Sequence, residues 1–129
     1  MKRHGILNRE LAGIFARLGH TDKIVIADCG LPIPDGVTCI DLAYKLGEPG
    51  FNTILQVVLD DLKVEHGYIA EEISEANKSV EQFILQNVEP ITYISHEQLK
   101  DMTKQAKVII RTGETTPYAN IILQCDCLF

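Results

Sequence analysis

The sequence predicts a single α/β domain, in which one layered sheet carries helices on both of its faces. Short apolar runs such as 24–27 and 108–110 are typical of strands that are buried on both faces. Stretches with apolar residues at i, i+3 and i+4 alternate with these runs, and this order of elements favours a layered α/β sheet. A chain of 129 residues is long enough for one core and too short for two, so we expect one domain, 1–129.

The first half of the chain is expected to hold two helices and two strands. Asn8 is a good N-cap and Gly19 a good residue just past a helix C-terminus, and these two bound the first helix. The strand 24–27 follows and ends at Asp28. The remaining elements of this half, a Gly- and Pro-containing loop, a strand and a helix, are expected at 29–36, 37–42 and 51–62.

The second half is expected to continue the alternation. Ser95 and Gln98 have the spacing of a capping box, which predicts a helix from Ser95 to about Gln105. Apolar periodicity predicts another helix that ends near Asn87. The expected elements of this half, strand, helix, strand, helix, strand and strand, cover 64–73, 76–87, 91–94, 95–105, 108–110 and 121–123.

Composition and charge exclude several classes of protein. The net charge is −6, whereas a protein that binds the phosphate backbone of nucleic acids needs clustered Lys and Arg. No apolar run is long enough to span a bilayer, and polar residues from Asn8 onwards interrupt the start before a signal-peptide core can form. We therefore expect a cytoplasmic protein with neither nucleic-acid nor membrane partners.

Motifs for cofactors and metals are missing from the sequence. It contains no GxGxxG, P-loop, HExxH or GxSxG, so no cofactor is predicted. In a reducing compartment the four cysteines are expected to be free, packed thiols. Cys125 and Cys127 are two apart and would share one face of a strand. A metal site would need about two further ligands that no local motif supplies, so no metal is predicted.

Polar residues directly follow several of the expected strands. Asp28, the pair Ser95-His96 and the turn 111–114 each come just after a strand end. In open α/β sheets, ligands bind in the crevice outside the carboxyl ends of the strands. The pattern alone therefore predicts a site at this edge of the sheet.

His20 is the first candidate for chemistry. It follows Gly19 and is expected at a helix C-terminus, where the macrodipole favours a protonated imidazole. Asp22 and Asp28 are placed to hydrogen-bond a ring nitrogen and fix its tautomer. The alternative is that His20 serves only as a favourable charge at the helix end.

His96 and Lys100 form the second candidate group. They are four residues apart on the expected helix and share a face, so both can point at one ligand. The alternative is that both are solvated side chains. The stretch 111–120 is unusually polar between two buried strands, which suits either a binding loop or a plain connection.

Several blocks of the sequence, in order and spacing, resemble the ribose pyranase and fucose mutarotase family. The likeness spans the whole chain and is carried by 2–8, 18–22, 26–28, 30–32, 95–97, 110–114, 116–120 and 128–129. Thr21 and the run Gly30-Leu31-Pro32 favour the ribose branch over the fucose branch. The chain departs from close relatives at Cys29 and in the tail Cys125-Asp126-Cys127.

The resemblance implies a cofactor-free enzyme that interconverts the pyranose and furanose forms of D-ribose, with His20 as the general acid. It further implies a homo-oligomeric ring, expected to be a decamer. The residues implied to bind the sugar are Asp28, His96, Tyr118, Ala119 and Asn120, with Lys100 as a weaker candidate.

Three other functions remain open from the sequence. These are a fucose mutarotase, a sugar-binding accessory protein of ribose uptake without catalysis, and a nucleotide-binding regulatory domain. The absence of a Gly-rich phosphate loop counts against the last of them.

Overall fold

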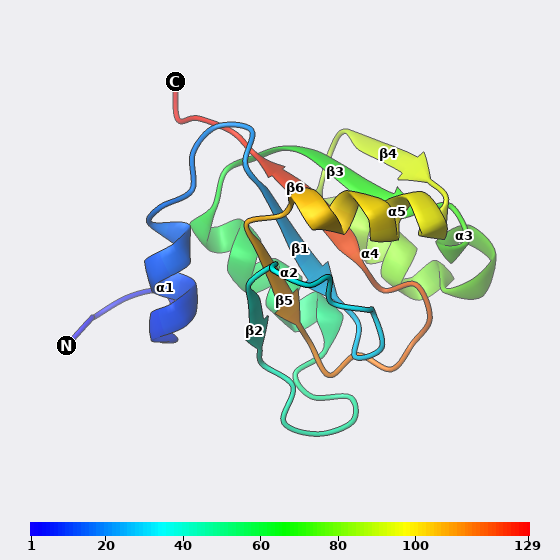
Figure 1. Ribbon diagram of the computed structural model, residues 1–129, viewed down its shortest axis with the longest axis horizontal. Helices are drawn as coiled ribbons and strands as arrows, with labels where there is room; N and C mark the ends of the chain where they lie inside the picture. Colours follow the sequence, from blue (N-terminus) through cyan, green and yellow to red (C-terminus); the bar gives the residue numbers. More distant parts are fainter.

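The computed structural model describes residues 1–129 and consists of one six-stranded sheet with helices packed around it (Figure 1). The strand order is β2-β5-β1-β6-β3-β4. The strands are β1 (Lys23–Ala27), β2 (Cys39–Asp41), β3 (Val64–Ala70), β4 (Ile91–Ile94), β5 (Val108–Arg111) and β6 (Ile121–Cys125). The helices are α1 (Arg9–Phe15), α2 (Phe51–Asp61), α3 (Ile73–Ala76), α4 (Lys78–Asn87) and α5 (His96–Met102), which a 3₁₀ turn (Thr103–Gln105) extends.

Strand β6 runs against all the others. It pairs antiparallel with β1 on one side and with β3 on the other, whereas the pairs β1–β5, β2–β5 and β3–β4 are parallel. The carboxyl ends of five strands therefore share one edge of the sheet with the amino end of β6. This edge collects the segments that follow Asp28, Ile94 and Arg111 together with the segment that precedes Ile121 (Figure 1).

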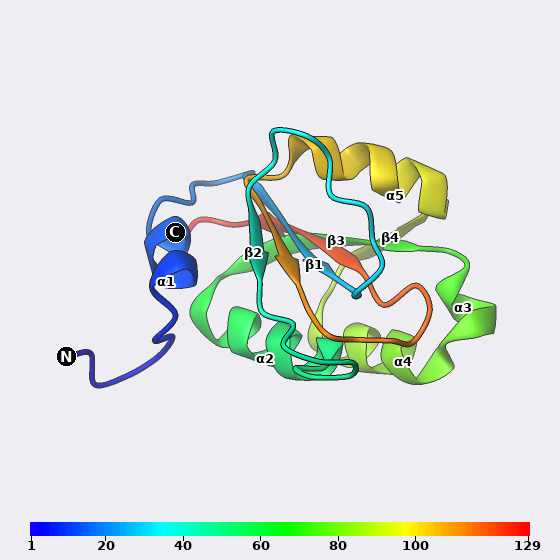
Figure 2. The same cartoon turned by 60° about the horizontal axis from the view of Figure 1, so that its bottom comes forward.

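Helices cover both faces of the sheet, as the sequence predicts. Helix α5 lies over one face, and α2 and α4 lie over the other (Figure 2). Side chains at alternating positions of β1 and β5 therefore point to opposite faces. Val25, Ala27 and Ile109 pack on the α5 side, with Leu99. Ile24, Ile26 and Ile110 pack on the other side, in the larger core with α2 and α4. Continuous apolar runs in β1 and β5 thus follow from burial on both sides. No helix combines the length and apolar character needed to cross a bilayer.

The first helix is shorter than predicted. It ends at Phe15 rather than near Gly19, because residues 19–22 form a turn of their own. The Asp22 carboxylate accepts a hydrogen bond from the Gly19 N–H at 2.8 Å and the Asp22 N–H donates to the Gly19 carbonyl at 3.2 Å. Short polar side chains that bond to nearby backbone in this way compete with helix formation.

The segment 64–87 also differs from the prediction. Strand β3 ends at Ala70 rather than Ile73, and the helix expected over 76–87 begins at Lys78, after the short helix α3 and a break at Asn77. Asn77 has φ −153° and accepts a hydrogen bond from the Val80 N–H at 3.4 Å, so it caps α4. Apolar periodicity continues through this break, which is why the pattern conceals it.

Candidate functional site

A polar cavity of about 300 Å³ lies at the edge of the sheet where the sequence predicts a site. Its walls come from three segments: the one after β1, the start of α5 and the one before β6. The lining residues are Asp28, Cys29, Gly30, Leu31, His96, Glu114, Thr115, Thr116, Pro117 and Tyr118. The fold therefore brings together Asp28, His96 and Tyr118, which are far apart in sequence.

Asp28 is held by hydrogen bonds from two directions. Its Oδ1 accepts the Gly30 N–H at 2.9 Å, and its Oδ2 accepts the Asn120 side-chain amide at 2.9 Å. The Asn120 Oδ1 accepts the Asp28 N–H at 2.7 Å, so Asn120 contacts both the backbone and the carboxylate of Asp28. Each carboxylate oxygen keeps unused acceptor capacity. Asp28 is thus a fixed acceptor at the wall of the cavity.

His96 stands at the first position of α5 and faces Tyr118. The two rings meet edge to face, with centroids 5.1 Å apart and an interplanar angle of 82°. The backbone N–H of His96 donates to the Glu72 carboxylate at 3.0 Å, which fixes the start of the helix. The His96 Nδ1 is buried without a hydrogen-bond partner in the protein. Buried polar atoms are rarely left unpaired, so this nitrogen is an exception in the wall of the cavity.

Just after β5, the backbone at Gly113 packs closely against the backbone at Glu48. A Cβ on Gly113 would lie only 2.5 Å from the Glu48 carbonyl oxygen, so this position requires glycine. The Gly113 N–H donates to the Pro49 carbonyl at 2.8 Å. Thr112, fully buried, donates its hydroxyl to the Ala27 carbonyl at 2.8 Å. These contacts tie the loop to β1 and to the segment before α2.

Glu114, in the loop between β5 and β6, lines the cavity. Its carboxylate accepts the Phe51 N–H at the start of α2 at 2.9 Å and the Thr116 hydroxyl at 2.8 Å. Burial by itself raises the pKa of Glu114, but the hydrogen bonds from Phe51, Thr116 and Thr115 together outweigh it and hold the pKa below its ordinary value. Glu114 is therefore an anionic residue of the cavity.

Asn77 is a supporting residue that the sequence did not reveal. It is buried, and its amide donates both to the Thr116 hydroxyl and to the Pro117 carbonyl at 2.9 Å. These bonds lock the loop against the junction of α3 and α4. The signal was present as an N-cap residue ahead of an apolar run, but the continuous helical periodicity masked it.

The segment before β6 is not extended at Tyr118. Tyr118 has φ 57°, in the left-handed region, and the Asn120 N–H donates to the Tyr118 carbonyl at 2.9 Å. The segment therefore turns back on itself. Ala119 and Asn120 are fully buried, while Tyr118 is partly exposed and lines the cavity. Asn120 therefore contacts Asp28 and does not itself line the cavity.

Lys100 does not line the cavity. Its Nζ lies 2.7 Å from Glu97 Oε1, in an i, i+3 pair on the surface of α5. Of the two residues expected to face one ligand from α5, the structure places only His96 at the cavity wall.

His20 lies at the opposite edge of the sheet from Asp28. The two residues flank the two ends of β1, whose five residues span roughly 16 Å. His20 is five residues beyond the end of α1, so the expected placement at a helix C-terminus is wrong. Neither Asp22 nor Asp28 contacts its ring. Its Nε2 instead lies 2.9 Å from the Glu65 carboxylate and 3.9 Å from Asp126 Oδ1.

Two non-glycine residues adopt positive φ angles, and both adjoin candidate site residues. Thr21, with φ 71°, follows His20, and Tyr118, with φ 57°, lines the cavity. Such conformations are unfavourable for residues with a Cβ, above all for a β-branched threonine, and they persist where surrounding contacts impose them. Both turns are therefore held in fixed positions by the fold.

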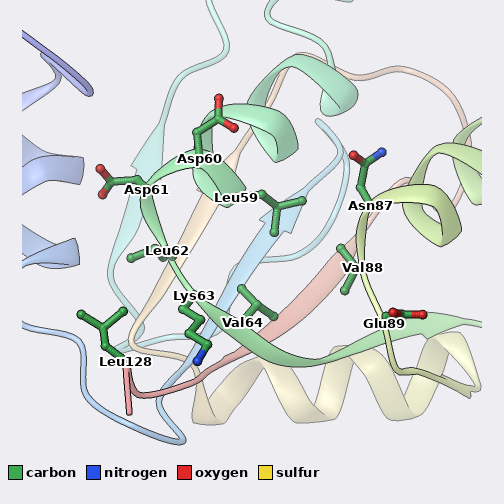
Figure 3. Close-up of a pocket in the computed structure, with 10 residues that line it drawn as sticks. All are labelled: Leu59, Asp60, Asp61, Leu62, Lys63, Val64, Asn87, Val88, Glu89 and Leu128. Atoms are coloured by element: carbon green, nitrogen blue, oxygen red, sulfur yellow. The ribbon is translucent and has the colours of Figure 1, made fainter.

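A larger hollow, of about 540 Å³, lies away from these residues (Figure 3). It is formed by the end of α2, the start of β3 and the segment after α4, with Leu128 at its rim. Its side chains are aliphatic, amide and charged groups without a histidine or an aromatic ring. The smaller cavity beside Asp28 is therefore the better candidate for chemistry.

The fold and the cavity define a small α/β protein with a small polar cavity at the carboxyl edge of its sheet. The profile of the RbsD / FucU transport protein family matches residues 1–128, and the chain belongs to this family. Two D-ribose pyranases from Bacillus cereus strains are 58% and 55% identical to it, over the full length of both proteins in each case.

Solved structures show the same fold. The structure of Bacillus subtilis RbsD complexed with D-ribose superposes with a TM-score of 0.98 at 53% identity and covers all of both chains. The fucose mutarotase of Streptococcus pneumoniae in complex with L-fucose has a TM-score of 0.80 at 24% identity, covering 99% of this chain and 100% of the other. The latter likeness concerns the fold alone.

Proposed function

We propose that this protein is a D-ribose pyranase, an isomerase that interconverts the pyranose and furanose forms of D-ribose and so supplies ribose-consuming reactions. The main support is identity above 50% over the full chain to D-ribose pyranases, together with the similarity to a ribose-complexed relative. The cavity volume of about 300 Å³ is at the lower end of the range for small-molecule sites, which suits a monosaccharide.

The chemistry requires two proton transfers and no change of oxidation state. The proton of the anomeric hydroxyl is removed while the ring oxygen is protonated, which opens the hemiacetal to the free aldehyde. A different hydroxyl then adds to the carbonyl and closes the other ring. A histidine titrates near neutral pH and performs either transfer, and we assign His20 as the general acid. No cofactor is required for these steps.

The sugar is proposed to bind through Asp28, His96 and the segment 118–120. Asp28 accepts hydrogen bonds from sugar hydroxyls, and His96 contributes its ring to the wall of the cavity. The Tyr118 ring can lie on the C–H face of the sugar. Asn120 contributes by holding Asp28, since its amide is already bonded to that carboxylate.

We further propose that His20 acts in the cavity of a neighbouring copy. His20 and Asp28 flank opposite ends of β1 and cannot meet on one sugar within a single chain. A head-to-tail ring, expected to be a decamer, would place the His20 edge of one subunit against the cavity edge of the next. Large exposed apolar side chains, among them Tyr44, Leu46 and Phe129, provide surface for such contacts.

The proposed activity is tested by NMR saturation transfer between the ring forms of D-ribose. We expect the purified protein to increase the exchange rate over that of ribose alone. A protein that binds ribose but leaves this rate unchanged would be a non-catalytic accessory protein. Exchange of L-fucose anomers, measured in the same way, would instead identify the activity of the fucose branch.

The oligomer is predicted to have a mass near ten times the 14.4 kDa chain in light scattering. A head-to-tail interface that repeats without closure would give filaments, so a single discrete mass is the expected signature of a ring. A sharp monomer peak at micromolar concentration would contradict both the ring and the shared site.

Replacing Asn120 with alanine is predicted to weaken ribose binding by about 1–3 kcal/mol, because Asp28 loses the donor that orients it. Ribose titration and a melting curve are measured together, since Asn120 is fully buried and its loss is also expected to lower stability. Asn87→Ala, at an exposed asparagine of α4, is the matched control and should change neither. Unchanged affinity with a lowered melting temperature would leave Asn120 with a structural role.

We also propose that the protein works in the cytoplasm. All four cysteines are free in the structure. Free thiols suit a reducing compartment. The proposed supply of furanose to ribose-consuming reactions requires the same location.

A further inference from the structure

The tail that follows β6 meets the turn that carries His20. The Thr21 N–H donates to the Cys125 carbonyl at 2.9 Å, and the Cys125 N–H donates to the Asp22 carbonyl at 2.8 Å. These two backbone hydrogen bonds fix the turn against the end of the strand. They bring Asp126 and Cys127 beside His20, although about a hundred residues separate the two segments in the sequence.

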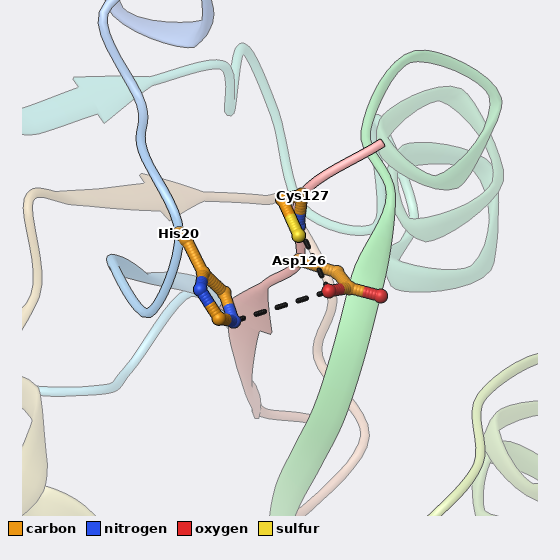
Figure 4. Close-up of side chains that lie close together, drawn as sticks. All are labelled: His20, Asp126 and Cys127. Carbon is orange, nitrogen blue, oxygen red and sulfur yellow. Dashed lines mark hydrogen bonds and ion pairs between the residues drawn. The ribbon is translucent and has the colours of Figure 1, made fainter. Parts of the chain in front are cut away.

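Three potential metal ligands converge at this junction (Figure 4). The His20 ring nitrogen, a carboxylate oxygen of Asp126 and the Cys127 thiol all lie within 4.8 Å of one another. The expectation that Cys125 and Cys127 share a strand face is wrong, because β6 ends at Cys125. Cys125 is buried, whereas Cys127 lies beyond the strand and is partly exposed. The fold thus supplies the additional ligands that no local motif provides.

The two carboxylates at this junction are held in place as anions. Asp126 Oδ1 accepts the Cys127 N–H at 2.8 Å, which is the main reason that its pKa is lowered, and Oδ2 lies 3.5 Å from Lys63 Nζ. Glu65 Oε2 lies 2.9 Å from His20 Nε2. Hydrogen bonds from the Gln124 amide, the larger cause, and from His20 lower the pKa of Glu65. Partners that orient ligand carboxylates in this way are typical of metal sites.

The donor set selects the kind of metal. Imidazole, thiolate and carboxylate are the ligands of Zn²⁺, which prefers four of them in a tetrahedron, whereas Mg²⁺ and Ca²⁺ prefer oxygen ligands alone. Zinc bond lengths of about 2.0–2.3 Å place neighbouring ligand atoms about 3.3–3.8 Å apart. The present separations, up to 4.8 Å, therefore need to close by only about 1 Å, and the His20 side chain is 51% exposed, so a small rotation of its ring can supply this change.

We propose that His20, Asp126 and Cys127 bind Zn²⁺, with Glu65 or a water molecule as the fourth ligand, and that the bound zinc inhibits ribose ring interconversion. Inhibition follows because a coordinated imidazole has no free lone pair to exchange a proton with the sugar. This part of the proposal rests on the proposed role of His20. When zinc binds, the S–H bond of Cys127 is replaced by an S–Zn bond and the displaced proton goes to solvent.

Cobalt(II) reports on the site without reference to activity. In the assembled full-length protein, Co²⁺ is expected to bind one ion per subunit and to give a near-ultraviolet thiolate charge-transfer band with visible bands of tetrahedral cobalt. Cys127→Ser should abolish the thiolate band. The same substitution should also weaken Zn²⁺ binding, measured by competition with a chelating dye. The expected loss of affinity is at least the roughly 10–100-fold that removal of an outer-shell partner costs.

Cys39→Ser is the matched control, because Cys39 is exposed on β2 and away from His20. It should retain both the band and the zinc affinity of the wild type. A thiolate band that survives in Cys127→Ser, or that disappears in Cys39→Ser, would overturn the assignment. So would a wild-type protein that gives no thiolate band at all.

Inhibition is measured as the ratio of ribose exchange rates with and without saturating Zn²⁺ for each protein. The wild type should lose nearly all catalysed exchange and regain it with EDTA, whereas Cys127→Ser should be resistant at the same zinc concentration. Binding without inhibition would leave the site in place but contradict the effect on His20. If the zinc-free wild type shows no exchange, the proposed function fails, and the cobalt spectrum still decides the metal site.

Discussion

Replacing His20 with alanine is expected to reduce catalysed ribose ring interconversion by about 10²–10⁴-fold, the usual contribution of a positioned general acid or base. The fold should remain intact, because the side chain is 51% exposed and its contact is an exposed pair with Glu65, a type of interaction that contributes little to stability. NMR saturation transfer gives the rate, and a melting curve with light scattering gives the folded, assembled state.

The matched control is His66→Ala. His66 lies on β3 next to Glu65 and, like His20, has one hydrogen-bonding contact, with its Nε2 2.6 Å from the Thr92 hydroxyl. This variant should exchange ribose at the wild-type rate. A folded, assembled His20→Ala protein that exchanges ribose as fast as the wild type would refute the assignment of the general acid.

Mixed oligomers of two inactive variants are expected to recover activity. In an oligomer made only of His20→Ala subunits, every site lacks His20. In one made only of Asp28→Asn subunits, every site lacks the Asp28 carboxylate. When the two are co-expressed with different tags and purified through both, some cavities with an intact Asp28 receive an intact His20 from the neighbour. Random assembly of equal amounts makes about a quarter of the sites complete in a head-to-tail ring.

The control for complementation is co-assembly of His20→Ala with the double variant His20→Ala/Asp28→Asn, which contains no intact His20. Its exchange rate should stay at that of His20→Ala alone. If the mixed oligomer of single variants is no faster than this control, His20 and Asp28 do not act in one site across an interface.

Local elements were predictable where one physical cause dominates. The strands at 24–27 and 108–110 were evident because burial on both faces leaves no polar position in the run. The cap at Ser95 was equally clear, because the capping box with Gln98 is a local pattern and both of its hydrogen bonds are present. The edge location of Asp28 and His96 followed from these strand ends.

Features that depend on tertiary contacts were not predictable. The turn after α1 is set by its bonds to the end of β6, so its distance from Asp28 could not be inferred from the sequence. The conformation of Tyr118 depends on anchors that include the hydrogen bond from Asn77 to the Pro117 carbonyl, which spans forty residues. The direction of β6 follows from its pairing with β1 and β3, and it has no signature in an apolar run of three residues.

The reversed direction of β6 gives each subunit two unlike edges. Asn120, just before the strand, contacts Asp28 at the cavity of its own chain, while Cys125, the last residue of the strand, holds the turn that carries His20. In the proposed assembly, every subunit is half of one site and half of the next. An open chain of subunits would always leave one cavity without a neighbour's His20 at one end and one His20 without a cavity at the other. Ring closure alone removes this loss, so activity per subunit measures how completely the rings are closed.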